Sequence, residues 1–417
     1  MNTQTSSGAR RLRFFAAAVF AVFVSAAEAS GPVSGVTVRQ RYPWNGLVDI
    51  SFSLSEDAIV TVSATDTGTG AVLPVATLSE GGEAVVNGQT GLAAGEHKLV
   101  WNADTDVPNA LHENVEVTVS ADNSLYMVID LTKKDANGKF VVSYRSGPPV
   151  GGWPIEYKTK KLVLRKIKAG KFMMGSPSSE WGRDTNETQH QVTLTKDFYF
   201  SIFEVTFGQL YLVTGESQGD YSWGAQYPAR LSPGSTTAYS KANAFAETLS
   251  SMSGVSANLP TEAQWEYACR AGTKTALYTG GNPSCSAELR IEFAGRECYA
   301  CGGSNGRQSS VLYDPDDNSY SVPVGEFLPN PWGLYDMCGN VSEVCRDLYV
   351  ADLSSSSVVD PITTTGSDNV VRGGDWYSAD SRCRSAWRNK GMPKDLFNSN
   401  MTGQSIGFRV IVAVPGS

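Results

Sequence analysis

Histidine is scarce in this chain of 417 residues, which contains three copies. His97, His112 and His190 are scattered, so none of them forms a metal-ligand motif with another. The same scarcity argues against an iron centre built on a histidine cluster. No serine, Ser385 included, has a nearby His/Asp pattern, so the sequence offers no candidate for serine nucleophilic catalysis.

An excess of basic residues is also lacking. The chain has 34 Lys and Arg against 42 Asp and Glu, a formal net charge of −8. Nucleic acids and anionic membranes are bound by clustered Lys and Arg, so neither is expected as the main partner. Beyond the N-terminal segment, no apolar run reaches the ~20 residues of a transmembrane helix. We therefore expect no integral membrane segment in the mature chain.

Residues 1–29 have the pattern of a secretory signal peptide. Three arginines precede an apolar run at 14–24 that is too short to span a bilayer, and Ala27-Glu28-Ala29 supplies small residues for cleavage. The pair Arg10-Arg11 leaves twin-arginine export open, although the surrounding residues fit that pattern poorly. We expect an exported protein in a periplasmic, cell-surface or extracellular location.

All seven cysteines follow this segment, in a compartment expected to be oxidising. Because seven is odd, at least one thiol is unpaired or pairs outside the chain. Cys298 and Cys301 form a C-x-x-C motif, but no second pair or histidine accompanies it. A loop disulfide or unpaired thiols therefore explain it better than a metal site.

The region 30–120 is predicted to be an all-β sandwich. Apolar and polar residues alternate strictly over 48–54, as a strand with one buried face requires, and 59–64 and 115–119 repeat the pattern. Glycine-rich turns separate these runs. Residues 121–160 are predicted to be a linker, within which 125–131 could form one strand.

A second domain is predicted over 161–414, with few helices and many loops. Thr206 with Gln209, and Thr261 with Gln264, have the spacing of capping boxes that begin helices. A third helix is expected around 238–249, where apolar residues recur at helical spacing. The whole chain is therefore expected to be an α+β protein with a separate β module ahead of it.

Five phrases follow one another in the second domain: LPTEAQWEYACRAG (259–272), NPWGLYDMCGNVSEV (330–344), VVRGGDW (370–376), CRSAWRN (383–389) and IGFRV (406–410). In this order they resemble the formylglycine-generating enzymes, or sulfatase-modifying factors, whose fold is a variant of the C-type lectin fold. The segment 39–46 similarly resembles the opening of immunoglobulin-like modules found ahead of such domains. The resemblance implies an oxidase that converts a sulfatase cysteine to formylglycine.

The copper site that this resemblance implies is incomplete here. Family oxidases carry two cysteines, five residues apart, after the glycine pair of the RGG phrase, and thiolates suit Cu(I). The matching positions are Ser378 and Cys383. A serine hydroxyl is a poor Cu(I) ligand, so we expect no copper centre, with Cys383 as the sole candidate catalytic residue. An alternative alignment makes Cys383 a structural cysteine.

The resemblance implies two further features. Calcium would be held at Asp336, Gly339, Val341 and Glu343, through two carboxylates and two backbone carbonyls, and hard oxygens suit Ca²⁺. The alternative is a solvated loop with a capping carboxylate. A disulfide between Cys269 and Cys383 is also implied.

We therefore predict a catalytically silent domain that binds a protein or glycan. The C-terminal region also resembles the variable ligand-binding segment of diversity-generating retroelement proteins. The expected binding surface consists of Asp375, Trp376, Tyr377, Ser378, Arg382, Arg384 and Trp387. Two alternatives remain: a working oxidase acting on a sulfatase, and a structural protein of the cell envelope.

Overall fold

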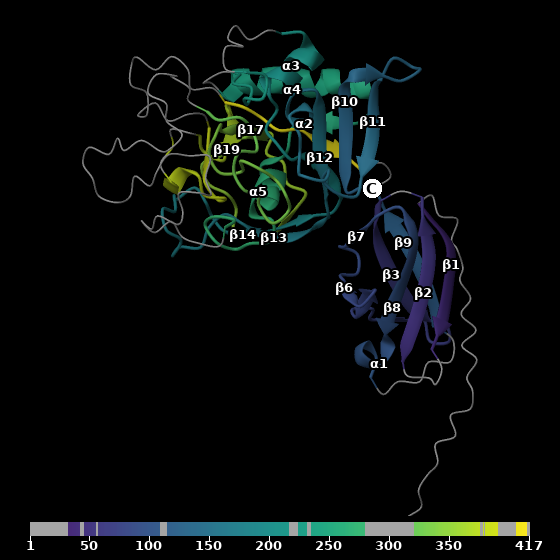
Figure 1. The fold of residues 1–417 in the computed structure, drawn as a ribbon. Coiled ribbons are helices and arrows are strands. Elements are labelled where there is room, and N and C mark those ends of the chain that lie inside the picture. The colour runs from purple at the N-terminus through teal and green to yellow at the C-terminus, as the bar shows by residue number, and fades with distance from the viewer. Residues whose placement is uncertain are drawn as a thin grey trace, which may run out of the picture. The chain divides into compact units, whose positions relative to one another are not determined.

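The computed structural model describes residues 32–41, 46–55, 57–108, 115–216, 224–231, 235–279, 321–375, 378, 380–390 and 406–414. The chain divides into two compact units, Met1–Asn123 and Ser124–Ser417, which are drawn in Figure 1. The predicted signal peptide, Cys298 and Cys301 lie outside the described residues. No helix in the described ranges is long and apolar enough to cross a membrane.

The N-terminal unit is the predicted β-sandwich. Its elements are β1 (Val33–Gln40), β2 (Leu47–Leu54), β3 (Ala58–Asp66), β4 (Ala71–Leu73), β5 (Leu78–Glu80), β6 (Glu83–Val85), β7 (Gly91–Leu92), β8 (Gly95–Asn102), α1 (Ala103–Asp106) and β9 (Val115–Asp122). One sheet has the order β1-β2-β8-β5-β6, and in the other β3 pairs with β4, β7 and β9. In β2, every second residue from Val48 to Leu54 is buried, as the alternation predicts.

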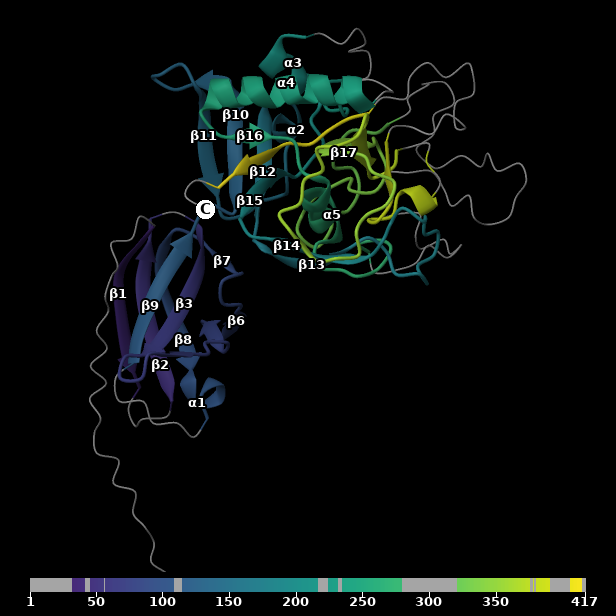
Figure 2. The ribbon, with the colours of Figure 1, turned by 180° about the vertical axis from the view of Figure 1, so that it is seen from behind.

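A six-stranded sheet organises the C-terminal unit. It comprises β10 (Tyr126–Lys134), β11 (Phe140–Arg145), β12 (Lys161–Ile167), β15 (Phe198–Ser201), β16 (Ala257–Asn258) and β21 (Ile411–Ala413). The strand order is β11-β10-β12-β15-β21-β16, so the last strand of the chain lies between β15 and β16 (Figure 2).

The sheet corrects the prediction that 121–160 is a linker. Strands β10 and β11 lie in that range, and β10 pairs with both β11 and β12. All six residues from Tyr126 to Leu131 are buried. A strand covered on both faces shows no alternation of polar and apolar residues, which is why the pattern gave a weak signal here.

Helices cover both faces of this sheet. They are α2 (Glu156–Thr159), α3 (Phe207–Thr214), α4 (Ser235–Ser253) and α5 (Glu262–Arg270). Figure 1 shows α3 and α4 above the sheet, where α4 shares a core with Met127 and Ile129 of β10. Helix α5 belongs to the apolar cluster that includes Val128, on the other face. Both predicted capping boxes are present, at Thr206 and Thr261.

Two small sheets complete the unit. One consists of β13 (Gly170–Met174), β14 (His190–Leu194) and β18 (Val358–Val359), and the other of β17 (Glu343–Leu348), β19 (Asn369–Arg372) and β20 (Arg388–Asn389). The second sheet pairs residues from three of the five phrases named in the sequence analysis. Glu343 stands opposite Arg372, and Arg372 stands opposite Arg388. The phrases on which the family resemblance rests therefore meet at one place.

Candidate functional site

The RGG phrase makes a tight turn after β19. Gly373 and Gly374 have φ values of +89° and +67°, in the left-handed region that favours glycine. A Cβ on Gly373 would lie 3.1 Å from the ring of Trp265. One on Gly374 would lie 2.8 Å from the carbonyl oxygen of Arg382 and 2.9 Å from Sγ of Cys383. The turn thus needs both glycines and brings Cys383 against its backbone.

Ser378, which the resemblance would place at the first copper-ligand position, forms its hydrogen bonds within this turn. Its hydroxyl donates to Oδ1 of Asp375 at 2.7 Å and accepts from the Asp375 amide at 3.0 Å. The Ser378 amide donates to the Asp375 carbonyl at 2.9 Å. Both residues are buried. The Ser378 hydroxyl therefore closes a local turn, a role that serine and aspartate commonly take.

Cys269 is a thiol, so the disulfide predicted between Cys269 and Cys383 is not formed in this structure. Sγ of Cys269 lies 3.6 Å from the carbonyl oxygen of Met337 and 3.5 Å from Oγ of Ser385. The Cys338 thiol helps to lower the pKa of the same thiol. The sulfur that was expected to bond Cys383 thus lies beside Met337, the residue before a second cysteine, Cys338.

The predicted binding surface is largely interior. The structure buries Asp375, Ser378, Arg384 and Trp387, leaves Arg382 half-buried, and does not describe Trp376 and Tyr377. The physical reason is that the RGG turn and the strand after it fold inward to meet partners in the core. These four residues are therefore not exposed to a ligand in this structure.

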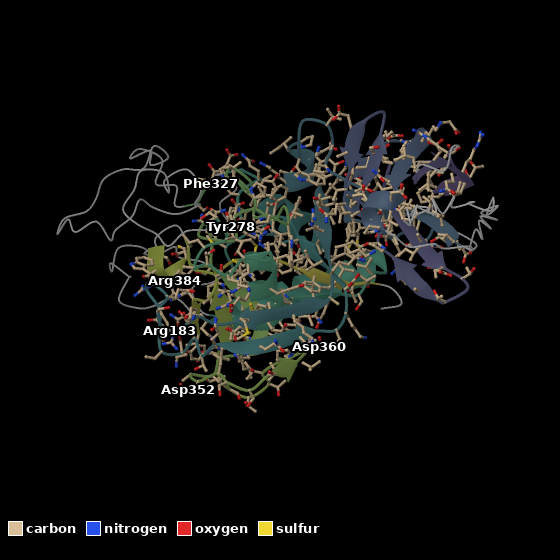
Figure 3. All side chains as sticks on the ribbon, turned by 90° about the horizontal axis from the view of Figure 1, so that it is seen from below. Arg183, Tyr278, Phe327, Asp352, Asp360 and Arg384 are labelled. Carbon is tan, nitrogen blue, oxygen red and sulfur yellow. The ribbon has the colours of Figure 1, made fainter. Side chains whose placement is uncertain are left out.

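Arg384 is an example: its partners in the core are two carboxylates. Its guanidinium donates to Glu187 at 2.6 Å and 2.8 Å and to Glu180 at 2.8 Å. It also donates to the carbonyl of Gly182, and Figure 3 shows Arg384 and Arg183 at the same end of the unit. Burial raises the pKa of Glu180, whereas at Glu187 the Arg384 bonds outweigh burial and lower the pKa.

A second set of buried ion pairs joins three of the five phrases, those at 259–272, 370–376 and 383–389. Arg388 donates to both oxygens of Glu262, at 2.6 Å and 2.9 Å. Glu266 accepts from Arg270 at 2.8 Å and from Arg372. Burial would raise the pKa of Glu262, but Arg388 outweighs it, so the carboxylate stays charged. Phrases that are separate in sequence are thus joined by matched charges.

The loop predicted to hold calcium has an unusual backbone. Asp336 and Asn340 have φ values of +55° and +61°, which are uncommon for residues with side chains. Asn340 donates through Nδ2 to Glu204 at 2.7 Å, and the amide of Val341 donates to the same carboxylate at 3.2 Å. Glu204 was not among the predicted site residues. Its one sequence signal is the stretch Glu204-Val205-Thr206, which is similar to a phrase near the start of family domains.

Charge at this loop is poorly balanced. Glu343 accepts from Arg409 and from Trp265, each at 2.7 Å. Asp336 accepts from the Gly325 amide at 2.6 Å through Oδ2, while its Oδ1 is buried without a hydrogen-bond partner. Burial raises the pKa of Asp336 to about 6. Burial and the nearby Asp336 also raise the pKa of Glu204.

A family model for the sulfatase-modifying factor enzyme 1-like domain matches residues 157–414, more than half of the chain. The chain belongs to this family. The predicted resemblance and fold class are therefore confirmed.

Relatives of this sulfatase-modifying factor domain protein include enzymes and proteins of other names. Formylglycine-generating enzymes of Thermomonospora curvata and Streptomyces coelicolor are 35% and 33% identical, over 30% and 36% of this chain and 40% and 45% of their own length. A serine/threonine-protein kinase pkn1 of Chlamydia caviae is 28% identical over 54% of this chain and 35% of its own. This chain thus spans less than half of each relative.

Solved structures also resemble it. PvdO from Pseudomonas aeruginosa has a TM-score of 0.47 and 27% identity, covering 60% of this chain and 94% of that one. Treponema denticola variable protein 1 has a TM-score of 0.44 and 18% identity, covering 61% and 96%.

The calcium ligands that the family implies fit the structure in part. The buried Oδ1 of Asp336, which lacks a partner, is the kind of hard oxygen that Ca²⁺ prefers. Both oxygens of Glu343 already accept hydrogen bonds. No group of three or more His, Cys, Asp or Glu side chains in the described ranges is arranged to hold a metal. A cation here would therefore depend on Asp336 and the backbone carbonyls of Gly339 and Val341.

Proposed function

We propose that this protein is an exported, catalytically silent member of the sulfatase-modifying factor family whose C-terminal domain binds a protein or glycan. The observation that carries the proposal is the state of Ser378. It stands where the first copper thiolate of the oxidases is expected, and its hydroxyl forms two hydrogen bonds with Asp375. A protonated hydroxyl held in this way is a poor partner for a soft ion.

The burial of the cysteines also supports a catalytically silent domain. Cys383 is 4% exposed, and Cys269 and Cys338 beside it are buried completely or nearly so. An oxidase must bring a substrate cysteine to its metal. The relatives include proteins named as kinases as well as formylglycine-generating enzymes, so similar sequences occur in proteins that are not named for the oxidase.

Cu(I) titration of the purified protein tests the catalytic half of this proposal. We expect the wild type and Cys383→Ala to bind copper equally, and Ser378→Cys to gain about one tight equivalent. Ser381→Cys, a thiol added on the 3₁₀ helix η3 (Asp380–Arg382), is the matched control and should gain none. A wild-type copper ion lost in Cys383→Ala, with oxygen uptake on a cysteine-containing sulfatase peptide, would establish the oxidase instead.

The binding half is tested on glycan and protein arrays. A selective set of ligands, retained by Cys383→Ala, is expected. An absence of any selective binding on either array would favour the structural alternative, a protein of the cell envelope that acts as a spacer.

We also propose that Ca²⁺ stabilises the 336–343 loop through Asp336. The support is the unpartnered, buried Oδ1 and the crowding of Glu204, Asp336 and Glu343 around one arginine, Arg409. Thermal unfolding in Ca²⁺ and in EGTA checks this. Calcium should raise the Tm of the wild type and leave that of Asp336→Asn unchanged, whereas equal shifts in both proteins would place the ion elsewhere.

A further inference from the structure

Three cysteines from distant parts of the C-terminal domain meet in one core. Cys269 lies in the last turn of α5, Cys338 lies in the loop before β17, and Cys383 follows η3. Their exposed fractions are 0%, 1% and 4%, and all three belong to the same apolar cluster. Several buried thiols in one cluster differ from an isolated core cysteine, because each thiol has more than one neighbouring cysteine with which it could form a disulfide.

Cys269 is the central member of this thiol cluster. Its sulfur lies 3.6 Å from the carbonyl of Met337, the residue before Cys338, and the Cys338 thiol is near enough to affect its pKa. On the other side it lies 3.5 Å from Oγ of Ser385, two residues after Cys383. The Cys338 thiol also interacts electrostatically with Cys383. One sulfur therefore lies between the two segments that carry the other thiols.

We propose that Cys269 is a shared disulfide partner, which bonds Cys338 in one form of the protein and Cys383 in another. A Cys269–Cys338 bond would attach α5 to the loop that carries Asp336. A Cys269–Cys383 bond would attach α5 to the segment after the RGG turn. Exchange between them would change which of two neighbouring loops is held covalently, and one of the three cysteines is always left reduced.

The chemistry is balanced in two steps. In the first, two thiols lose two protons and pass two electrons to an external disulfide such as oxidised glutathione, which is reduced to two thiols. In the second, the remaining thiolate attacks Sγ of Cys269, a new S–S bond forms, and the displaced sulfur leaves as a thiolate and takes up a proton. The second step involves no net oxidation.

Local electrostatics favour Cys269 as the thiol that attacks the external disulfide in the first step. Burial alone would raise the pKa of its thiol, but the hydrogen bonds with Cys338 and Ser385, together with Arg270 and Arg372, lower it. Burial and the bond to Cys269 raise the pKa of the Cys338 thiol well above its usual value. A thiolate at Cys269 is therefore favoured over one at Cys338.

Disulfide mapping tests the proposal. The full-length protein is equilibrated in glutathione buffers of defined ratio, quenched with acid, alkylated and digested, and the linked peptides are counted by mass spectrometry. We expect wild-type protein to yield both Cys269–Cys338 and Cys269–Cys383 peptides. Cys383→Ala should yield the first alone, and Cys338→Ala the second alone. Cys345→Ala, a buried cysteine of the same core, is the matched control and should leave the wild-type ratio unchanged.

Two outcomes would overturn the proposal. One is a wild type that forms only Cys269–Cys383 at every glutathione ratio, with Cys338 always alkylated. The other is a Cys383→Ala protein in which Cys269 stays reduced under oxidising conditions. Because the wild type alone supplies the first readout, the test survives a variant that fails to fold.

Discussion

The two units of this protein use different means to fill their cores. Over residues 32–123 the sequence has three Lys and Arg against twelve Asp and Glu. Within the described part of that unit, Asp66 is the one polar or charged residue that is buried. The C-terminal unit instead buries whole ion pairs, among them Glu262 with Arg388 and Glu343 with Arg409.

The difference shows what each fold requires of its sequence. A sandwich core needs alternating apolar residues, which the hydrophobic effect selects without regard to direction. A buried charge is costly unless a partner stands at hydrogen-bond distance in a fixed geometry. The five sequence motifs of the C-terminal unit are thus first of all sites where such charges must match, and these matched charges identify the fold.

The largest expected effect comes from breaking that ionic core. Arg372 is fully buried and donates to Glu266 and to the carbonyls of Ser385, Ala386 and Trp387. Replacing it with methionine removes one of the two cations that pair with the buried Glu266 and leaves three buried carbonyls without their donor. We expect the free energy of unfolding of the C-terminal unit to fall by about 3–5 kcal/mol. Guanidinium unfolding followed by tryptophan fluorescence measures it.

The matched control is Arg41→Met in the sandwich, where the Arg41–Asp49 pair is partly exposed. That change should leave the unfolding of its own unit nearly unaltered. Equal, small losses in both units would refute the contrast.

The next effect is a pH dependence that differs between the units. Burial raises the pKa of Asp347 to about 6, although the amides of Glu262 and Thr363 donate to it. In the unfolded chain this carboxyl ionises near 3.8. Between these values the folded state binds more protons, so the free energy of unfolding falls as pH rises, by about 3 kcal/mol for this group.

Urea unfolding from pH 4 to 7 measures this slope. Asp347→Asn, which cannot ionise, should flatten it by that amount. In the sandwich, Arg41 lowers the pKa of Asp49, so its contribution is present above pH 4 and is lost as pH falls. A slope that Asp347→Asn leaves unchanged would assign the pH dependence to other groups.

Much of the fold could be predicted from the sequence because its signals are local. The alternation in β2 and the capping boxes at Thr206 and Thr261 each depend on a few neighbouring residues. The strand β10 gave a weaker signal, since burial on both faces removes the alternation that marks a strand. The linker prediction was wrong for this reason.

The candidate site could be predicted less well, because burial and pairing depend on distant segments. Arg384 was predicted to bind a ligand because it is a charged residue after the RGG turn. It is instead paired with Glu180 and Glu187, which lie about 200 positions earlier in the chain. Glu204 likewise reaches Asn340 across 136 positions. No spacing rule links such residues, and only the fold shows that they meet.

The smallest expected effect comes from removing the helix N-caps at Thr206 and Thr261. It tests whether these helix starts depend on neighbouring residues alone. Thr261 accepts the Gln264 amide at 3.1 Å, and Thr206 accepts that of Gln209 at 3.3 Å. Losing such a cap costs about 1 kcal/mol. Thr206 also donates to the carbonyl of Lys158 at 2.8 Å, which ties the cap of α3 to α2. We therefore expect Thr206→Ala to lower the free energy of unfolding more than Thr261→Ala, with Thr→Ser at each position restoring most of the loss. Equal losses at the two caps would mean that the tertiary bond adds nothing, and that helix starts in this unit are encoded as locally as the strands of the sandwich.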